Sequence, residues 1–292
     1  MKNTIQHVFC PLLAAIIWGG AFSAQSICAE YVTPFWLNAI RSAIACVLLF
    51  IICAVRRLKI ENWKDLILGG FCCGICLFLA GNAQQIGVAE TSAGKAGFIT
   101  TLYVVLVPIA SILLGKKVGK RIWGAVAIAI IGLYFLCITE EFTIGRGDLF
   151  VLLCAVLFTG QIIVVDHFVQ KHDGFALSCG MFFFASIFSC IAALCGEDLS
   201  QCSVQSCIGA ILYVSVLSSC GGYTLQIISQ KGGNPTLVSL LLGLESVFAM
   251  IAGAIILGER MTGRELFGSA LMLSAVILAQ LPGKKAKHTA EA

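Results

Sequence analysis

Long runs of apolar residues, separated by short polar segments, follow one another along the whole chain. A helix needs about 20 apolar residues to cross a hydrocarbon core of roughly 30 Å. An open sheet would leave backbone groups unpaired in lipid, and the period-two alternation of strands is absent. The pattern therefore predicts helical spans at residues 8–28, 35–55, 66–88, 95–114, 122–138, 148–168, 175–195, 207–229, 236–257 and 265–281.

The composition supports this interpretation. Of 292 residues, 59% are apolar and 12% are charged, whereas about a quarter of a soluble domain is charged. We therefore expect an all-α integral membrane protein with ten spans. A signal peptide ending near Ala21-Phe22-Ser23 is a disfavoured alternative, because the apolar run continues past that cleavage signal.

Positive charges fall at alternate ends of the predicted spans. Lys and Arg in short loops resist translocation, so the side that carries them is cytoplasmic. With the N-terminus inside, the outer ends hold Lys95, Arg146, Arg260 and Arg264. The inner segments hold many more, namely Lys2, Arg56, Arg57, Lys59, Lys64, Lys116, Lys117, Lys120, Arg121, Lys171, Lys231, Lys284, Lys285 and Lys287. This predicts a multi-pass protein of a cell membrane, such as a bacterial inner membrane, with both termini cytoplasmic.

Two stretches of similar sequence indicate an internal duplication. "ILLGKKVGKRIWG" (112–124) and "IILGERMTGRELFG" (255–268) each join two predicted spans. Five spans separate them, so an odd number places them on opposite sides of the membrane. We therefore predict two five-helix repeats of opposite orientation, residues 1–143 and 144–292. Inverted repeats of this kind can rock about a central site and expose it to either side in turn.

Several short motifs carry a family resemblance. The step Leu257-Gly258-Glu259-Arg260, followed by Phe267-Gly268-Ser269-Ala270-Leu271, resembles the end of each repeat in the EamA family of the drug/metabolite transporter superfamily. Trp18-Gly19-Gly20, Pro34, Arg41 and Pro235 fit the same resemblance, which covers essentially the whole chain. The first repeat departs from the pattern with Lys116 where the family usually has Glu, which argues against a role for a symmetric pair of glutamates.

The resemblance implies a secondary carrier that exports or exchanges small metabolites such as amino acids, through a central cavity lined mainly by spans 1, 3, 4, 6, 8 and 9. Efflux of drugs or organic cations is the alternative, and a membrane enzyme acting on lipid-linked substrates is a remote one. No HExxH, GxSxG or P-loop pattern occurs. We expect no enzyme, cofactor or metal site, and no nucleic-acid partner; the solute and the bilayer are the expected partners. The oligomeric state stays open.

Two charged side chains lie well inside predicted spans, Arg41 and Glu245. A charge in hydrocarbon costs at least about 2.5 kcal/mol, so each needs a reason to be there. Glu245 lies about 15 Å into its span, near the bilayer midplane. It is either a proton-titrating or amine-binding carboxylate or a structural partner of a hydroxyl, an amide or Arg41. Arg41 is favoured as a structural residue, and the two residues would form an outer gate if they pair.

Uncharged polar and aromatic residues within the spans are further candidates for solute binding. A binding pocket needs a few placed donors and acceptors in an apolar wall. The alternative for each is a plain interhelical hydrogen bond, worth about 0.6 kcal/mol in membranes. The substrate-binding set is Trp18, Gln84, Tyr103, Gln161, Tyr223, Gln226 and Glu245, with Asn82, Gln85, Thr100 and Thr101 as weaker candidates.

Fifteen cysteines occur in the chain, most of them inside predicted spans, where Cys behaves as a small apolar residue. Cys195, Cys202 and Cys207 flank an outer loop, and a disulfide among them is an open alternative. The Cys72-Cys73-Gly74-Ile75-Cys76 stretch lacks a second ligand cluster and does not predict zinc.

Overall fold

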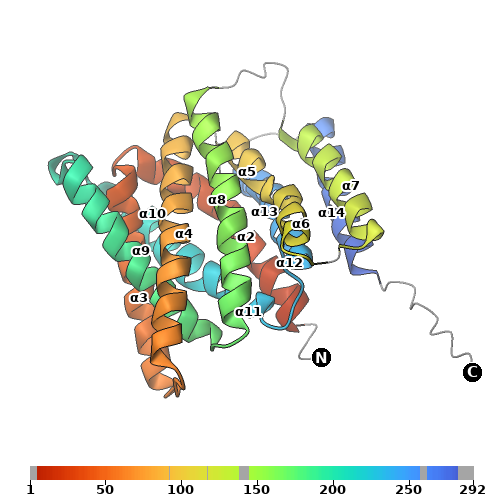
Figure 1. Ribbon diagram of the computed structural model, residues 1–292. Helices are drawn as coiled ribbons and strands as arrows, with labels where there is room; N and C mark the ends of the chain where they lie inside the picture. The colour runs from red at the N-terminus through yellow and green to blue at the C-terminus, as the bar shows by residue number, and fades with distance from the viewer. Residues whose placement is uncertain (1–4, 92, 117, 138–144, 257–261, 282–292) are drawn as a thin grey trace, which may run out of the picture.

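The computed structural model describes residues 5–91, 93–116, 118–137, 145–256 and 262–281, and within these ranges every regular element is a helix (Figure 1). The elements, in chain order, are η1 (Ile5–Phe9), α2 (Cys10–Ala29), α3 (Pro34–Val55), α4 (Trp63–Glu90), α5 (Ala93–Thr101), α6 (Tyr103–Leu113), α7 (Lys120–Cys137), α8 (Arg146–Val169), α9 (Gly174–Gly196), η2 (Leu199–Gln201), η3 (Val204–Cys207), α10 (Ile208–Leu212), η4 (Tyr213–Tyr223), α11 (Thr224–Gln230), α12 (Pro235–Leu242), α13 (Glu245–Ile256) and α14 (Gly263–Gln280).

Eight helical segments among the described residues are long and apolar enough to cross a membrane. They are Gln6–Ala29, Pro34–Val55, Trp63–Glu90, Lys95–Leu113, Arg146–Val169, Gly174–Gly196, Val204–Gln230 and Pro235–Ala252. A shorter apolar helix covers Leu266–Ala279 within α14. Many of their large apolar side chains are exposed on the outside of the bundle, such as Val55 and Leu113. The chain is therefore a multi-pass membrane protein, and the regular elements of its described ranges are all helices.

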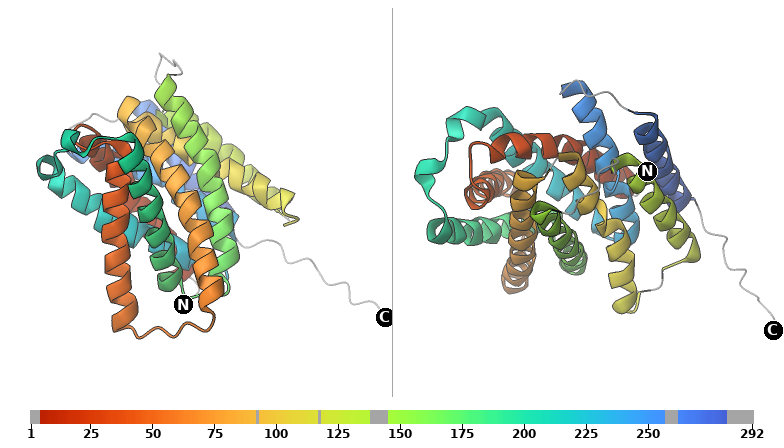
Figure 2. Two further views of the ribbon diagram at one scale, coloured as in Figure 1. Left: turned by 60° about the vertical axis from the view of Figure 1, so that its left-hand side comes forward. Right: turned by 90° about the horizontal axis from the view of Figure 1, so that it is seen from above.

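The helices run alternately up and down, so the connections form two opposite ends (Figures 1 and 2). The first described residues lie at the lower end of Figure 1, with the connections α3–α4, α8–α9 and α11–α12. The basic residues of these connections, Arg56, Arg57, Lys59, Lys171 and Lys231, therefore share one end. Several residues used in the sequence analysis lie outside the described ranges: Lys2, Lys117, Leu257, Gly258, Glu259, Arg260, Lys284, Lys285 and Lys287.

Glycines allow pairs of helices to approach closely. A Cβ atom at Gly70 of α4 would lie 2.9 Å from the carbonyl carbon of Gly180 in α9. A Cβ atom at Gly132 of α7 would lie 2.9 Å from the carbonyl oxygen of Gly268 in α14. Helix association in membranes depends on such close packing, because lipid supplies no hydrophobic drive. The α4–α9 and α7–α14 contacts are consequently intolerant of larger residues at these sites.

Three predicted spans are not single α-helices. Residues 95–114 divide into α5 and α6 at Leu102, and residues 236–257 divide into α12 and α13 at Gly243 and Leu244. The two interruptions meet, because a Cβ atom at Gly243 would lie 2.6 Å from Cγ2 of Val104. Residues 207–229 contain the π-helix η4, in which the Ser219 hydroxyl donates to the carbonyl of Val214, five residues earlier.

The 14 cysteines whose side chains the structure describes have free thiols, including Cys195, Cys202 and Cys207. The disulfide among these three cysteines, which the sequence left as an open alternative, is therefore not formed in this structure. Cys28 and Cys207 are buried in the same apolar cluster, together with Leu37 and Val214. Cysteine acts there as a small apolar side chain.

Candidate functional site

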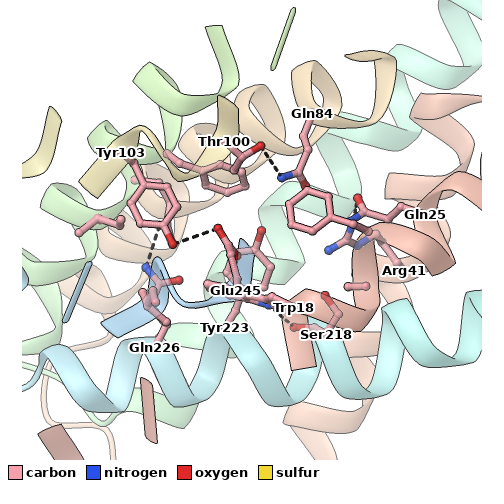
Figure 3. A pocket seen from close by; sticks show the side chains of 16 residues that line it. Trp18, Gln25, Arg41, Gln84, Thr100, Tyr103, Ser218, Tyr223, Gln226 and Glu245 are labelled. Carbon is pink, nitrogen blue, oxygen red and sulfur yellow. Dashed lines mark hydrogen bonds between the residues drawn. The ribbon is translucent and has the colours of Figure 1, made fainter. Parts of the chain in front are cut away.

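A pocket lies in the middle of the bundle, where α2, α3, α4, α8 and the interrupted spans come together (Figure 3). Its volume is about 30 Å³, room for a few water molecules. The structure brings together around it every residue of the predicted binding and gating sets: Trp18, Arg41, Gln84, Tyr103, Gln161, Tyr223, Gln226 and Glu245. Of the weaker candidates Thr100 lines it, whereas Asn82, Gln85 and Thr101 do not.

Glu245 lies at the point where the two interrupted spans meet. It is the first residue of α13, and its side chain is buried, with 3% of the residue exposed. The Tyr103 hydroxyl donates to its carboxylate at 3.0 Å (Figure 3). The Thr101 hydroxyl lies 3.4 Å from the same carboxylate oxygen. Thr101 ends α5 and Tyr103 begins α6. Discontinuous helices in corresponding positions of two halves mark the binding site in several transporter folds.

Arg41 lies on α3 at another part of the pocket wall and is 5% exposed. Its Nε donates to the Ser219 hydroxyl at 2.8 Å, and its Nη1 donates to Oε1 of Gln25 at 3.3 Å. The ion pairs among the described residues do not include Arg41 or Glu245. The two residues therefore line one pocket without forming the ion pair that the sequence left open, and Arg41 instead links α3 to α2 and η4.

An aromatic wall closes one side of the pocket. The rings of Trp18 and Tyr223 lie 4.8 Å apart, and Phe158 stands 6.3 Å from Tyr223. The indole Nε1 of Trp18 donates to the carbonyl of Ser218 at 3.2 Å (Figure 3). Gly222 makes room for the indole, because a Cβ atom there would lie 2.4 Å from Nε1. The wall therefore joins α2 to η4 and leaves aromatic faces on the pocket.

The glutamines of the predicted set have partners in the protein. Gln226 of α11 donates to Oε1 of Gln161 in α8 at 3.0 Å, so this hydrogen bond joins the two helices at the pocket. Gln84 of α4 donates to the hydroxyl of Thr100 in α5 at 3.4 Å. These bonds fit the structural alternative, since each connects two helices, but the residues also line the pocket. These glutamines therefore both connect helices and line the pocket. If the helices around the pocket move apart, the hydrogen bonds of these glutamines must break or find other partners.

Sequence reasoning missed Gln25, Ser218 and Phe158, which also line the pocket. Gln25 follows Trp18 by seven residues, which is two helical turns, so both lie on one face of α2. That spacing was available in the sequence. Ser218 and Tyr223 are five residues apart and share a face because η4 is a π-helix. An α-helical reading places these two residues on different faces.

Ion pairs lie at both ends of the bundle. At the end where α4 and α8 meet the start of α5, Lys95 contacts Asp148 at 2.6 Å. At the opposite end Lys116, just after α6, contacts Asp166 of α8 at 2.5 Å. His172 lies there 3.0 Å from Asp65. No partner of Lys116 could be predicted from the sequence; the structure shows that Lys116 links the end of α6 to α8.

An all-helical bundle with apolar outer faces and a central pocket of buried polar and aromatic side chains defines a multi-pass membrane protein with an enclosed polar site. The chain belongs to the EamA-like transporter family, whose model matches residues 6–138 and again residues 145–281. The resemblance stated from the sequence motifs is thereby confirmed.

Relatives and a solved structure agree with this assignment. An uncharacterized transporter of Archaeoglobus fulgidus is 33% identical, over 92% of this chain and 84% of its own. The uncharacterized transporter YwfM of Bacillus subtilis is 25% identical, over 100% of this chain and 99% of its own. A WAT1-related chloroplastic protein of Arabidopsis thaliana is 27% identical, over 91% and 67%. One crystal structure superposes with a TM-score of 0.78, covering 94% of this chain and 96% of that chain; at 17% identity it shows the fold alone. The family and the names of the first two relatives point to a transporter and away from an enzyme.

Proposed function

We propose that this protein is a secondary transporter that exports or exchanges small metabolites such as amino acids by alternating access to the central pocket. The observation that carries the proposal is the convergence of Glu245, Arg41 and the polar and aromatic candidates on one pocket between the spanning helices. The helices that line the pocket come from both regions matched by the family model.

Two features support a division into inverted repeats, residues 1–143 and 144–292. The family model matches once on each side of the division, at 6–138 and 145–281. The helix contacts are compatible with a twofold arrangement, because α3 packs on α9 and α7 packs on α14. The contact of α4 with α8 then corresponds to the contact of η4 and α11 with α2. Ten spans in two halves follow if α7 and α14 also cross the membrane.

Alternating access would take place by rocking of these halves about the pocket. The pocket volume of about 30 Å³ holds only a few water molecules, so a metabolite enters when the helices separate. Separation at one end breaks Lys95–Asp148, and separation at the other breaks Lys116–Asp166. Basic residues gather at the end that holds the first described residues, which supports a cytoplasmic location for that end and for both termini in a bacterial inner membrane.

Glu245 is the proposed site of proton or amine binding. Its carboxylate is buried and accepts hydroxyl bonds from Tyr103 and Thr101. No Lys, Arg or His of the described chain lies within ion-pair distance of it. A proton and the ammonium group of a solute would alternately neutralise the Glu245 carboxylate. Arg41, bonded to Ser219 and Gln25, would hold α2, α3 and η4 together as a gate on its side of the pocket.

Efflux of organic cations is the second candidate, and the aromatic wall favours it. Trp18, Tyr223 and Phe158 present ring faces to the pocket that also holds Glu245. Aromatic faces and a carboxylate together bind quaternary or hydrophobic cations. The two candidate functions differ in their solutes, because an amino acid carries a carboxylate and an organic cation does not need one.

Reconstitution into liposomes tests the proposal. The purified protein is given labelled amino acids or labelled tetraphenylphosphonium, with and without a pH gradient. We expect saturable flux of one class, and loss of its pH dependence in Glu245→Gln. Glu30→Gln is the matched control, because Glu30 is an exposed carboxylate after α2. Absence of flux for every solute would refute the transport proposal, and normal coupling in Glu245→Gln would remove Glu245 from that role.

A further inference from the structure

A second, smaller pocket lies beside the central one. It is enclosed by α3, α4, α9 and the ring of Tyr223, and its volume is about 10 Å³. Arg41 and Tyr223 line both pockets, so they form the wall between them. A volume of this size accommodates one particle the size of a water molecule. The second pocket is therefore a polar side chamber of the proposed solute site.

Arg41 brings an uncompensated positive charge to this wall. A guanidinium has five N–H groups, and the hydrogen bonds of Arg41 use Nε and Nη1, with the neutral acceptors Ser219 and Gln25. No ion pair within the described ranges neutralises it. A charge buried between spanning helices is costly unless an opposite charge or a polar ligand accompanies it. The missing partner is an anion.

The other polar groups of the side chamber are set up to donate. The amide nitrogen of Asn38 donates to Asn82, and that of Asn82 donates to the Ser189 hydroxyl, so both amide donors have protein acceptors. Ser189 accepts in that bond, so its own proton is free for another acceptor. Ser42 also lines the chamber and is 4% exposed, and its hydroxyl can donate a proton to a ligand. The hydroxyls of Ser42 and Ser189 and the remaining N–H groups of Arg41 therefore line a chamber with no carboxylate in its wall.

We propose that Arg41, with Ser42 and Ser189, binds a small monovalent anion at the junction of the two pockets. The anion is a halide ion taken from solution or the carboxylate group of a solute lying in the central pocket. A halide, which is somewhat larger than water, would occupy the side chamber after a small outward shift of its walls. A carboxylate would reach Arg41 from the side of Gln25 and Trp18, which line the central pocket. The site itself does not depend on transport; the carboxylate source rests on the proposed function.

Thermal unfolding of the purified full-length protein in detergent measures the binding. Sodium chloride and sodium bromide are titrated against sodium methanesulfonate at constant ionic strength, so that only specific binding shifts the unfolding temperature. Leucine, acetate and leucinol are titrated in the methanesulfonate buffer. A halide source predicts protection by chloride and bromide. A carboxylate source predicts protection by leucine and acetate but not by leucinol, which lacks the carboxylate.

Variants assign the binding to these residues. Because a hydrogen bond to a charged group is worth about 1.5–3 kcal/mol, Arg41→Gln should raise the apparent dissociation constant of the protecting anion about tenfold or more. Ser42→Ala should raise it about threefold to tenfold, and it keeps the proposal testable if Arg41→Gln fails to fold. Ser186→Ala is the matched control, because the Ser186 hydroxyl is exposed and bonds within its own helix.

Bromide also gives a direct view of the site. Crystals soaked in sodium bromide should show an anomalous peak beside the Arg41 guanidinium if the source is a halide. The proposal is overturned if neither halides nor carboxylates protect the wild-type protein, or if Ser42→Ala and Arg41→Gln bind the anion as the wild type does. Anion protection without solute flux would refute the proposed function alone, and flux without anion protection would refute this site alone.

Discussion

The two interrupted spans are held to their neighbours in different ways. The span formed by α5 and α6 packs on α8 and is tied to it near both ends, by Lys95–Asp148 and Lys116–Asp166. The span formed by α12 and α13 packs on α2, where a Cβ atom at Gly19 would lie 2.5 Å from Cβ of Phe248. No ion pair joins α12 or α13 to α2 within the described ranges.

This difference indicates that two equivalent contacts of the proposed repeats are stabilised by different interactions, ion pairs in one and close helix packing in the other. Ion pairs at helix ends can separate into water at small cost, whereas close helix packing depends on the absence of a side chain. We therefore expect the α13–α2 contact to act as the rigid one and the α6–α8 contact to respond to charge and salt. Substitutions on each side test this assignment.

The largest effect is expected at Gly19. Gly19→Val places a new side chain against Phe248 and Ala249 of α13. The Cβ atom of the valine would lie 2.7 Å from the backbone nitrogen of Ala249. Overpacking costs about 1–3 kcal/mol or more, because backbone must move. The unfolding temperature in detergent should fall sharply. Gly160→Val, at an exposed site of α8 with open space around it, is the control; equal stability of the two variants would contradict a rigid α13–α2 contact.

An intermediate effect is expected at Asp148. Its carboxylate accepts from Lys95 at 2.6 Å, from the Thr91 hydroxyl at 2.8 Å and from the Gly145 backbone nitrogen at 2.7 Å. Asp148→Asn removes the charge that strengthens these bonds and weakens the N-terminal cap of α8, at a cost of about 2 kcal/mol. Chemical or thermal unfolding measures the loss. Asp198→Asn should change little, because this exposed carboxylate lies outside the spans and the Asn oxygen can still accept from the Ser200 backbone nitrogen.

The smallest effect is expected at Asp166. Its partner Lys116 is 47% exposed, so water screens the pair. Asp166→Asn should cost about 1 kcal/mol or less, and the difference from wild type should shrink in high salt. Unfolding measured at two ionic strengths checks this. A loss as large as that of Gly19→Val, unchanged by salt, would mean that the α6–α8 contact is the rigid one.

The positions of the spanning helices could be predicted, because a run of about 20 apolar residues strongly indicates a membrane-spanning helix. The segment 35–55 corresponds to α3 at Pro34–Val55, and 175–195 corresponds to α9 at Gly174–Gly196. The interruptions at Leu102 and Gly243 were not predictable, because they depend on contact between two spans distant in sequence. The π-helix η4 likewise has the same apolar composition as an α-helix and differs in its hydrogen bonds.

The pocket residues were predictable to the extent that polar groups inside apolar spans are conspicuous. Glu245 and Arg41 stood out for their charge, and both line the pocket. Their mutual separation could not be predicted, since an ion pair requires a geometry that spacing along the chain does not give. The role of Asp148 and Asp166 as partners of lysines on α5 and after α6 was hidden for the same reason.

Counterflow in proteoliposomes tests the central claim most directly. Vesicles loaded with an unlabelled amino acid are diluted into the labelled one, and uptake is compared with that into empty vesicles. Alternating access through the Glu245 pocket predicts saturable uptake that the internal solute accelerates, its loss in Glu245→Gln, and its retention in Glu30→Gln. Uptake that is non-saturable and indifferent to the internal solute, or identical in Glu245→Gln and wild type, would contradict the account.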